Sequence, residues 1–212
     1  MMINYLIYIS NGLIIIGFFL YLLLILCSNK KITNSDGFNV TKDILNEYNS
    51  INIIENKSII TVYNIRRKVI KIASKCYYGN KVSDIGVPLM EAGISIVDDK
   101  KNNFISFVSK LRPNLKFLYI LPIIAVIFNS VASIGDAKLG LVITCIFIII
   151  SYVLINVKME AVNLISDKLN KVIDKNDSIF VIKFLNRIIL CDKLVFIGEL
   201  VMVIRFVAML LK

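Results

Sequence analysis

The feature that most constrains this chain is a set of long apolar stretches that contain almost no charged residue. The first, Tyr5–Cys27, is interrupted only by Ser10, Asn11 and two glycines. At about 1.5 Å of rise per helical residue, a stretch of this length crosses a hydrocarbon core of about 30 Å. No Lys or Arg precedes it and no small-residue cleavage site follows it, so we expect a retained membrane anchor rather than a secretory signal peptide.

Three later stretches predict three more membrane spans. Phe117–Gly135 and Leu139–Val157 are separated by only three residues, which predicts an antiparallel pair of helices. Leu194–Leu211 is less purely apolar because it contains Glu199 and Arg205. These two charges point about 120° apart on a helix, so they cannot pair along it. Either the deeper Arg205 is functional or pairs within a bundle, or the helix is tilted or shallow and both charges reach the headgroups. The alternative for the third and fourth stretches is a buried or interfacial helix.

Charge sets the expected orientation. Residues 28–116 contain 15 Lys and Arg against 8 Asp and Glu, and residues 158–193 contain 7 against 5. Basic segments stay in the cytoplasm, so we predict a multi-pass protein of the cell membrane with its main loops cytoplasmic and both termini outside. Attraction to the lipid bilayer accounts for the basic loops. The sequence has no module typical of nucleic-acid binding, so we expect no nucleic-acid partner.

The remaining sequence predicts a small α+β domain. A short sheet is predicted by three β-branched runs, at Ile51–Ile54, Ile59–Tyr63 and Val69–Ala73. Apolar residues at helical spacing predict helices at Val40–Tyr48, Val82–Val97 and Met159–Ile173. Pro88 is harmless if its helix begins at Asp84 and costs about 3 kcal/mol if the helix begins at Asn80. The predicted fold class is an α+β integral membrane protein with four transmembrane helices.

Two features of composition limit the chemistry. The chain contains no histidine, which excludes any mechanism that needs an imidazole as a metal ligand, a base or a partner for a nucleophile. Its four cysteines lie far apart and form no CxxC pair; they are Cys27, Cys76, Cys145 and Cys191. This spacing is typical of single thiols in a reducing compartment.

The segment Tyr63–Val97 carries a resemblance to a known family. It reads Tyr63-Asn64-Ile65, Val69-Ile70-Lys71-Ile72 and Cys76-Tyr77, followed by Val82–Leu89 and then Met90-Glu91-Ala92-Gly93-Ile94. In order and spacing these elements resemble the YugP-like neutral zinc metallopeptidases of bacterial membranes, whose pattern leads from a Tyr-Asp-Pro turn and a Val-Arg-Leu strand to a His-Glu-x-Gly-His helix. Two further segments fall where that family has a Gly-Ala-Glu-Val-Ala helix and a Glu-Phe-Asp-Ala element, namely Asp36-Gly37 with Ile44-Leu45, and Lys158-Met159-Glu160-Ala161.

The apolar stretches and the resemblance together divide the chain into five parts. They are an N-terminal transmembrane anchor (1–28), a cytosolic zincin-like domain (29–116) that contains a degenerate HExxH helix (82–97), a transmembrane hairpin (117–157), cytosolic amphipathic helices (158–193) and a C-terminal transmembrane helix (194–212).

Departures from the family pattern decide the expected chemistry. HExxH helices bind zinc through two histidines four residues apart, and the Glu between them takes a proton from zinc-bound water. Here the histidine positions hold Met90 and Ile94, and the third ligand position implied by the resemblance holds Lys158, whose ammonium repels a cation. Glu91, at the general-base position, and Gly93 are retained. We therefore expect no metal site, no bound cofactor and no confident catalytic residue.

Two interpretations of Glu91 stay open: a remnant catalytic base, or a carboxylate that is solvated or pairs with Lys158. The leading hypothesis is a proteolytically inactive relative, a pseudopeptidase, that binds peptide segments or membrane proteins through its short sheet. One alternative is a small structural membrane protein. The other is an active zinc metallopeptidase with relocated ligands, drawn from Glu91, Glu160, Asp84 and Cys76.

Overall fold

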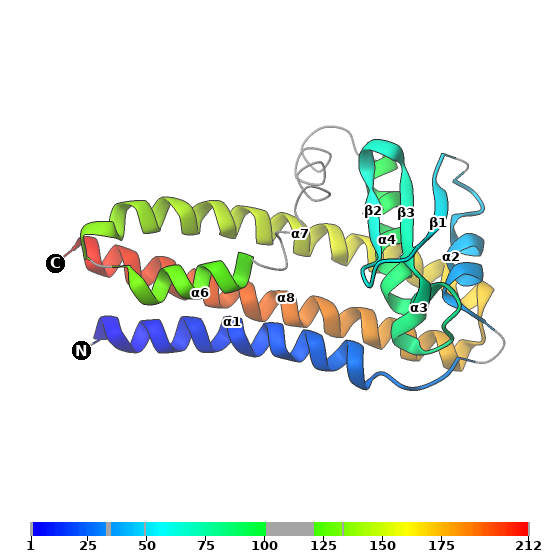
Figure 1. Ribbon diagram of the computed structural model, residues 1–212, viewed down its shortest axis with the longest axis horizontal. Helices are drawn as coiled ribbons and strands as arrows, with labels where there is room; N and C mark the ends of the chain where they lie inside the picture. Colours follow the sequence, from blue (N-terminus) through cyan, green and yellow to red (C-terminus); the bar gives the residue numbers. More distant parts are fainter. Residues whose placement is uncertain (1, 33–34, 49, 101–120, 133, 212) are drawn as a thin grey trace. The chain divides into compact units, whose positions relative to one another are not determined.

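The computed structural model describes residues 2–32, 35–48, 50–100, 121–132 and 134–211 and has a mostly helical α+β fold (Figure 1). The chain divides into two compact units. The helical unit consists of Met1–Leu22, Leu115–Ile155 and Leu190–Lys212, and the mixed unit consists of Leu23–Asn114 and Asn156–Ile189. Two long helices contribute residues to both units, α7 (Ala137–Val172) and α8 (Lys175–Leu210).

Two helices of the described chain are long and apolar enough to cross a membrane, namely α1 (Met2–Cys27) and α7. They coincide with the first and third predicted spans. The second predicted span contains α6 (Leu121–Val131), a helix of 11 residues, while its first residues, 117–120, lie outside the described residues, as does the predicted boundary at 116. A 3-10 helix, η4 (Ile134–Asp136), precedes α7.

The prediction of four spans is therefore met for two helices only. The fourth predicted span forms the C-terminal part of α8 but is not among the helices that qualify. The most C-terminal 18 residues of α8, 193–210, include Lys193, Glu199 and Arg205, and every other window of this length in α8 holds more charged residues. Three or more charges are costly in a hydrocarbon core. Glu199 and Arg205 are both buried within the protein.

Arg205 makes hydrogen bonds to another helix within the helical unit. The guanidinium donates from Nη1 to the backbone oxygen of Asn129 at 2.5 Å and from Nη2 to the backbone oxygen of Ala132 at 3.1 Å. Because α6 ends at Val131, these are carbonyls that a helix C-terminus leaves unpaired, and a cation there also complements the helix dipole. Asn129 donates in turn to Oγ of Ser10 on α1 at 2.7 Å. Of the two interpretations of Arg205, the structure supports binding within a bundle.

The mixed unit contains a three-stranded sheet. Its strands are β1 (Asn52–Asn56), β2 (Val62–Asn64) and β3 (Val69–Ala73), in the order β1-β3-β2. β1 is parallel and β2 antiparallel to β3. A 3-10 helix, η1 (Ile65–Arg67), joins β2 to β3 and ends at Lys68, which has a left-handed φ of 48°. The predicted sheet is confirmed, with β1 and β2 beginning later than their apolar runs.

Three helices pack with this sheet in the mixed unit: α3 (Ser74–Tyr77) and α4 (Val82–Lys100) against its strands, and α2 (Gly37–Leu45) against α3 and α4. α2 begins after Asp36, whose carboxylate accepts a hydrogen bond from the backbone N–H of Asn39 at 2.8 Å. As predicted, its apolar face is buried and consists of Val40, Ile44 and Leu45. α3 follows β3, and α4 packs against α2, α3, β2 and β3 (Figure 1).

Some helix boundaries differ from the prediction. α2 covers Gly37–Leu45 instead of Val40–Tyr48. The predicted helix Met159–Ile173 is the continuation of the third span within α7, because no Gly or Pro follows Val157 to end that span.

α4 begins at Val82, the predicted first residue. Pro88 is therefore internal and leaves the carbonyl of Asp84 without its helical donor. Gly37 packs there: a Cβ on it would lie 2.7 Å from this oxygen.

Arg205 gives a test of the helical unit. We expect Arg205→Met to lower the free energy of unfolding by about 2–4 kcal/mol, because the buried carbonyls of Asn129 and Ala132 lose their donor. Thermal unfolding of the detergent-purified protein, followed by circular dichroism, measures the effect. The control Arg66→Met removes an exposed arginine and is expected to leave the melting temperature unchanged. Equal melting temperatures for both variants would contradict the role given to Arg205.

Candidate functional site

The candidate site is the middle of α4, which holds Met90, Glu91 and Ile94. Every residue of α4 from Pro88 to Val97 is buried, because the sheet, α2 and α3 surround this helix. Met90 is 4% exposed and Ile94 is 2% exposed. The two positions at which the resemblance places histidine ligands are therefore filled by apolar side chains of the core.

α7 is in direct contact with this part of α4. A Cβ on Gly93 would lie 2.8 Å from Cβ of Ala161 and 2.6 Å from Cδ1 of Ile165. Lys158 precedes Ala161 by three residues, so it lies on the same face of α7, and it is half-buried. The motif helix and the helix that carries Lys158 thus face each other, and the three implied ligand positions offer neither imidazole, thiolate nor carboxylate.

Glu91 is bound to the sheet. Its side chain is 4% exposed, and Oε2 accepts a hydrogen bond from the backbone N–H of Tyr63 on β2 at 2.9 Å. The expectation of a solvated carboxylate is therefore wrong. A buried carboxylate is costly unless it receives hydrogen bonds, and the backbone donor of β2 supplies one. The predicted pairing of Glu91 with Lys158 stays a prediction.

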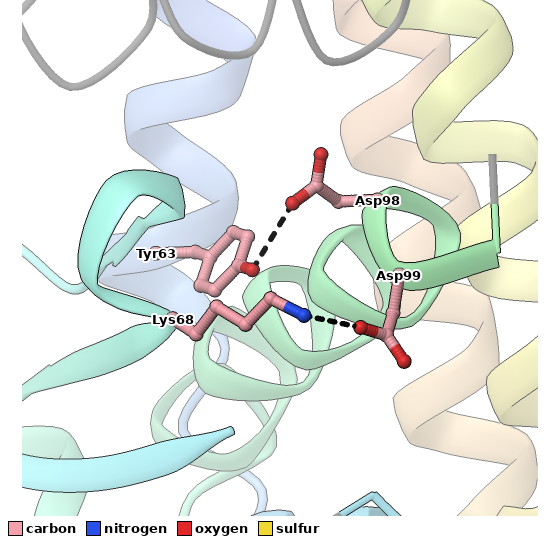
Figure 2. Close-up of polar contacts among 4 residues, drawn as sticks. All are labelled: Tyr63, Lys68, Asp98 and Asp99. Carbon is pink, nitrogen blue, oxygen red and sulfur yellow. Dashed lines mark hydrogen bonds and ion pairs between the residues drawn. The ribbon is translucent and has the colours of Figure 1, made fainter. Parts of the chain in front are cut away.

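The phenol of Tyr63 makes a second hydrogen bond to α4. Tyr63 Oη donates to Oδ2 of Asp98 at 3.2 Å, and beside it Nζ of Lys68 lies 2.6 Å from Oδ1 of Asp99 (Figure 2). Burial, together with the charge of Asp98, raises the pKa of Tyr63 above its usual range, so the phenol stays protonated and can donate. The hydrogen bond to Asp99 raises the pKa of Lys68. These contacts fix β2 and η1 to the C-terminal half of α4.

The alternative ligand set is spread over several elements. Cys76 is half-buried on α3, and burial raises the pKa of its thiol, which disfavours the thiolate that binds metals or attacks substrates. Asp84 precedes Glu91 by seven residues, about 10 Å along the helix axis, and Glu160 lies on α7. Within the part of the chain that the structure describes, no three His, Cys, Asp or Glu side chains form a group able to hold a metal ion.

Sequence reasoning missed the role of Tyr63. The partner of Glu91 is the backbone N–H of Tyr63, and because every residue except proline has such a group, the identity of residue 63 does not predict this contact. The available signal is on α4: Glu91 and Asp98 are seven residues apart, which places two carboxylates on one face of the helix. Such a pair indicates that polar donors approach that face.

Comparisons of this chain with protein-family models, with curated proteins and with solved structures give no match.

The contact between α4 and α7 predicts a cost for any side chain at Gly93. We expect Gly93→Ala to destabilise the protein by about 1–3 kcal/mol, because the new methyl group meets Ala161 and Ile165 at less than van der Waals distance. Thermal unfolding in detergent measures this. Gly12→Ala is the matched control, since a Cβ there meets nothing within 4 Å; a Gly93→Ala variant as stable as this control would show that α4 and α7 do not touch at Gly93.

The hydrogen bond of Glu91 gives a second prediction. We expect Glu91→Ala to lower the free energy of unfolding by about 1–3 kcal/mol and to speed exchange of the Tyr63 amide, because that N–H loses its acceptor. Glu91→Gln keeps an oxygen acceptor and should preserve most of the protection. Hydrogen exchange resolved at Tyr63 distinguishes the two variants, and slow exchange in Glu91→Ala would exclude the proposed bond.

Proposed function

We propose that this chain is a membrane-embedded, proteolytically inactive relative of the YugP-like neutral zinc metallopeptidases that acts by binding peptide segments or membrane proteins. One observation carries the proposal. On α4, which meets α7 at Gly93, Met90 and Ile94 are buried apolar residues, and α7 carries the cationic Lys158 three residues before Ala161. A divalent cation gains no ligand from these positions and is repelled by one of them.

The binding of Glu91 to β2 supports the loss of proteolysis. A general base in this chemistry must reach a metal-bound water. Here the carboxylate is buried and accepts the backbone N–H of Tyr63. Glu91 therefore has a structural role that accounts for its retention without catalysis.

In the proposed arrangement the chain crosses the cell membrane four times, with both termini outside and the main loops cytoplasmic. α1 and α7 are long and apolar enough for the first and third crossings. α6 and the C-terminal part of α8 would complete the second and fourth. The bonds of Arg205 to the end of α6 support the packing of these two helices against each other, since they satisfy a charge that lipid cannot.

The metal content of the detergent-purified protein tests the proposal. We expect no stoichiometric zinc by mass spectrometry and no chelator-sensitive cleavage of casein. The triple variant Met90→His, Ile94→His, Lys158→Glu restores the implied ligands and should gain about one zinc per chain. The matched double variant Met90→His, Ile94→His keeps the ammonium of Lys158 and should bind zinc more weakly than the triple variant.

Other outcomes would favour the alternatives. Stoichiometric zinc and chelator-sensitive cleavage in the natural chain would overturn the proposal in favour of relocated ligands, and loss of that zinc in Glu91→Ala would identify Glu91 as one of them. A protein that holds no zinc and retains no peptide segment in equilibrium binding measurements would fit a small structural membrane protein.

A further inference from the structure

One outer edge of the sheet is closed by α4. Tyr63 lies opposite Ile70 in the antiparallel pair of β2 and β3. Because the N–H of Tyr63 donates to Glu91, it points away from β3. Alternate residues of an antiparallel strand direct their backbone groups outward, so the outward donor of this three-residue strand is already bound. A peptide that added to β2 would have to displace a buried carboxylate.

The other edge is β1. The N–H of Asn52 donates to the backbone oxygen of Lys68 at 2.9 Å, which directs the backbone groups of Asn52 toward β3. Alternation along the parallel strand then turns the N–H and C=O groups of Ile53 and Glu55 outward. Since β1 is the outer strand of the described sheet, these groups have no strand partner among the described residues.

The side chains around β1 indicate what kind of partner fits. β1 contains no Lys or Pro, the residues that commonly prevent strand addition at an edge. Ile54 is 45% exposed, and Lys57 and Lys75 are exposed at the C-terminal ends of β1 and β3. The carboxylate of Glu55 accepts a hydrogen bond from Oη of Tyr78 at 2.9 Å. The edge thus combines an apolar side chain with two cations, and its own acid is engaged.

We propose that the outer edge of β1 binds an extended acidic peptide by strand addition, with Ile53 and Glu55 making the backbone hydrogen bonds. Only a polypeptide presents N–H and C=O groups at the repeat that a strand edge requires, and acidic residues complement Lys57 and Lys75. This inference rests on the proposed function, because it assigns the peptide binding proposed there to one edge and one class of peptide.

Amide hydrogen exchange of the detergent-purified chain tests the edge directly. The probe is a hexapeptide of alternating Glu and Val, and the matched control replaces each Glu by Lys. At a peptide concentration of about 100 Kd, the acidic peptide should slow exchange at Ile53 and Glu55 by about a hundredfold. The amide of Ile54 points toward β3 and should be protected with or without peptide. Unchanged exchange at Ile53 and Glu55 in the bound state would overturn the assignment.

Two variants separate the backbone and charge contributions. Ile53→Pro removes an outward N–H that β3 does not use, which an edge strand tolerates, so peptide binding should be lost while the amides of Ile70 and Ile72 stay protected. Lys57→Glu with Lys75→Glu should reverse the preference toward the Lys–Val peptide. A variant with Ile53→Pro that still binds the acidic peptide normally would refute strand addition at β1.

The outcomes also separate this inference from the proposed function. If the chain binds the peptide while Ile53 and Glu55 stay unprotected, only the assignment to β1 fails. If the chain contains stoichiometric zinc and cleaves casein, the proposed function fails whatever the edge does. Phosphatidylserine-containing vesicles serve as the lipid control, and equal protection of both amides by these vesicles would exclude peptide recognition as the purpose of the edge.

Discussion

The mixed unit depends on one requirement, which is that the carboxylate of Glu91 be satisfied inside an apolar core. An unpaired buried carboxylate costs several kcal/mol. The outward N–H of Tyr63 donates to this carboxylate, and their hydrogen bond attaches β2 to α4. Together with the contacts of Tyr63 and Lys68 to Asp98 and Asp99, this bond orients the short sheet on α4. It also occupies the outward donor of β2, which leaves β1 as the open edge. The need to give the buried carboxylate of Glu91 a hydrogen-bond donor accounts for the arrangement of the candidate site without reference to catalysis.

The helical unit also contains a buried charge that needs hydrogen-bond partners, and there the charge is positive. Arg205 is buried among apolar side chains, and its guanidinium binds backbone oxygens at the end of α6. In both units the backbone is the partner of the buried charge, as helix ends and strand edges are the places where backbone groups lack partners of their own. Each charge therefore fixes the position of one element: β2 in the mixed unit and α6 in the helical unit.

Elements with a strong local pattern could be predicted from the sequence. α1 follows from an apolar run long enough to span a membrane, and α2, α4 and the three strands follow from apolar periodicity and β-branched runs. The full length of α7 could not be predicted from apolar periodicity. At Val157 the sequence changes from apolar to amphipathic, but such a change does not by itself end a helix. The number of spans could not be fixed from the sequence, since at α8 composition alone cannot say whether Glu199 and Arg205 face lipid or protein. The partner of Glu91 was unpredictable because a backbone N–H has no sequence signature.

Gly93 and Glu91 on α4 need no catalytic explanation. Gly93 is required by the close approach of Ala161 and Ile165, and Glu91 by the donor of Tyr63. Met90 and Ile94 fill apolar space on the same helix, a role that many side chains of similar volume can take. Packing therefore limits what position 93 can hold, and hydrogen bonding limits position 91, whereas positions 90 and 94 require only apolar side chains of about the right volume. The constraints along this part of α4 are those of a helix at the centre of a fold.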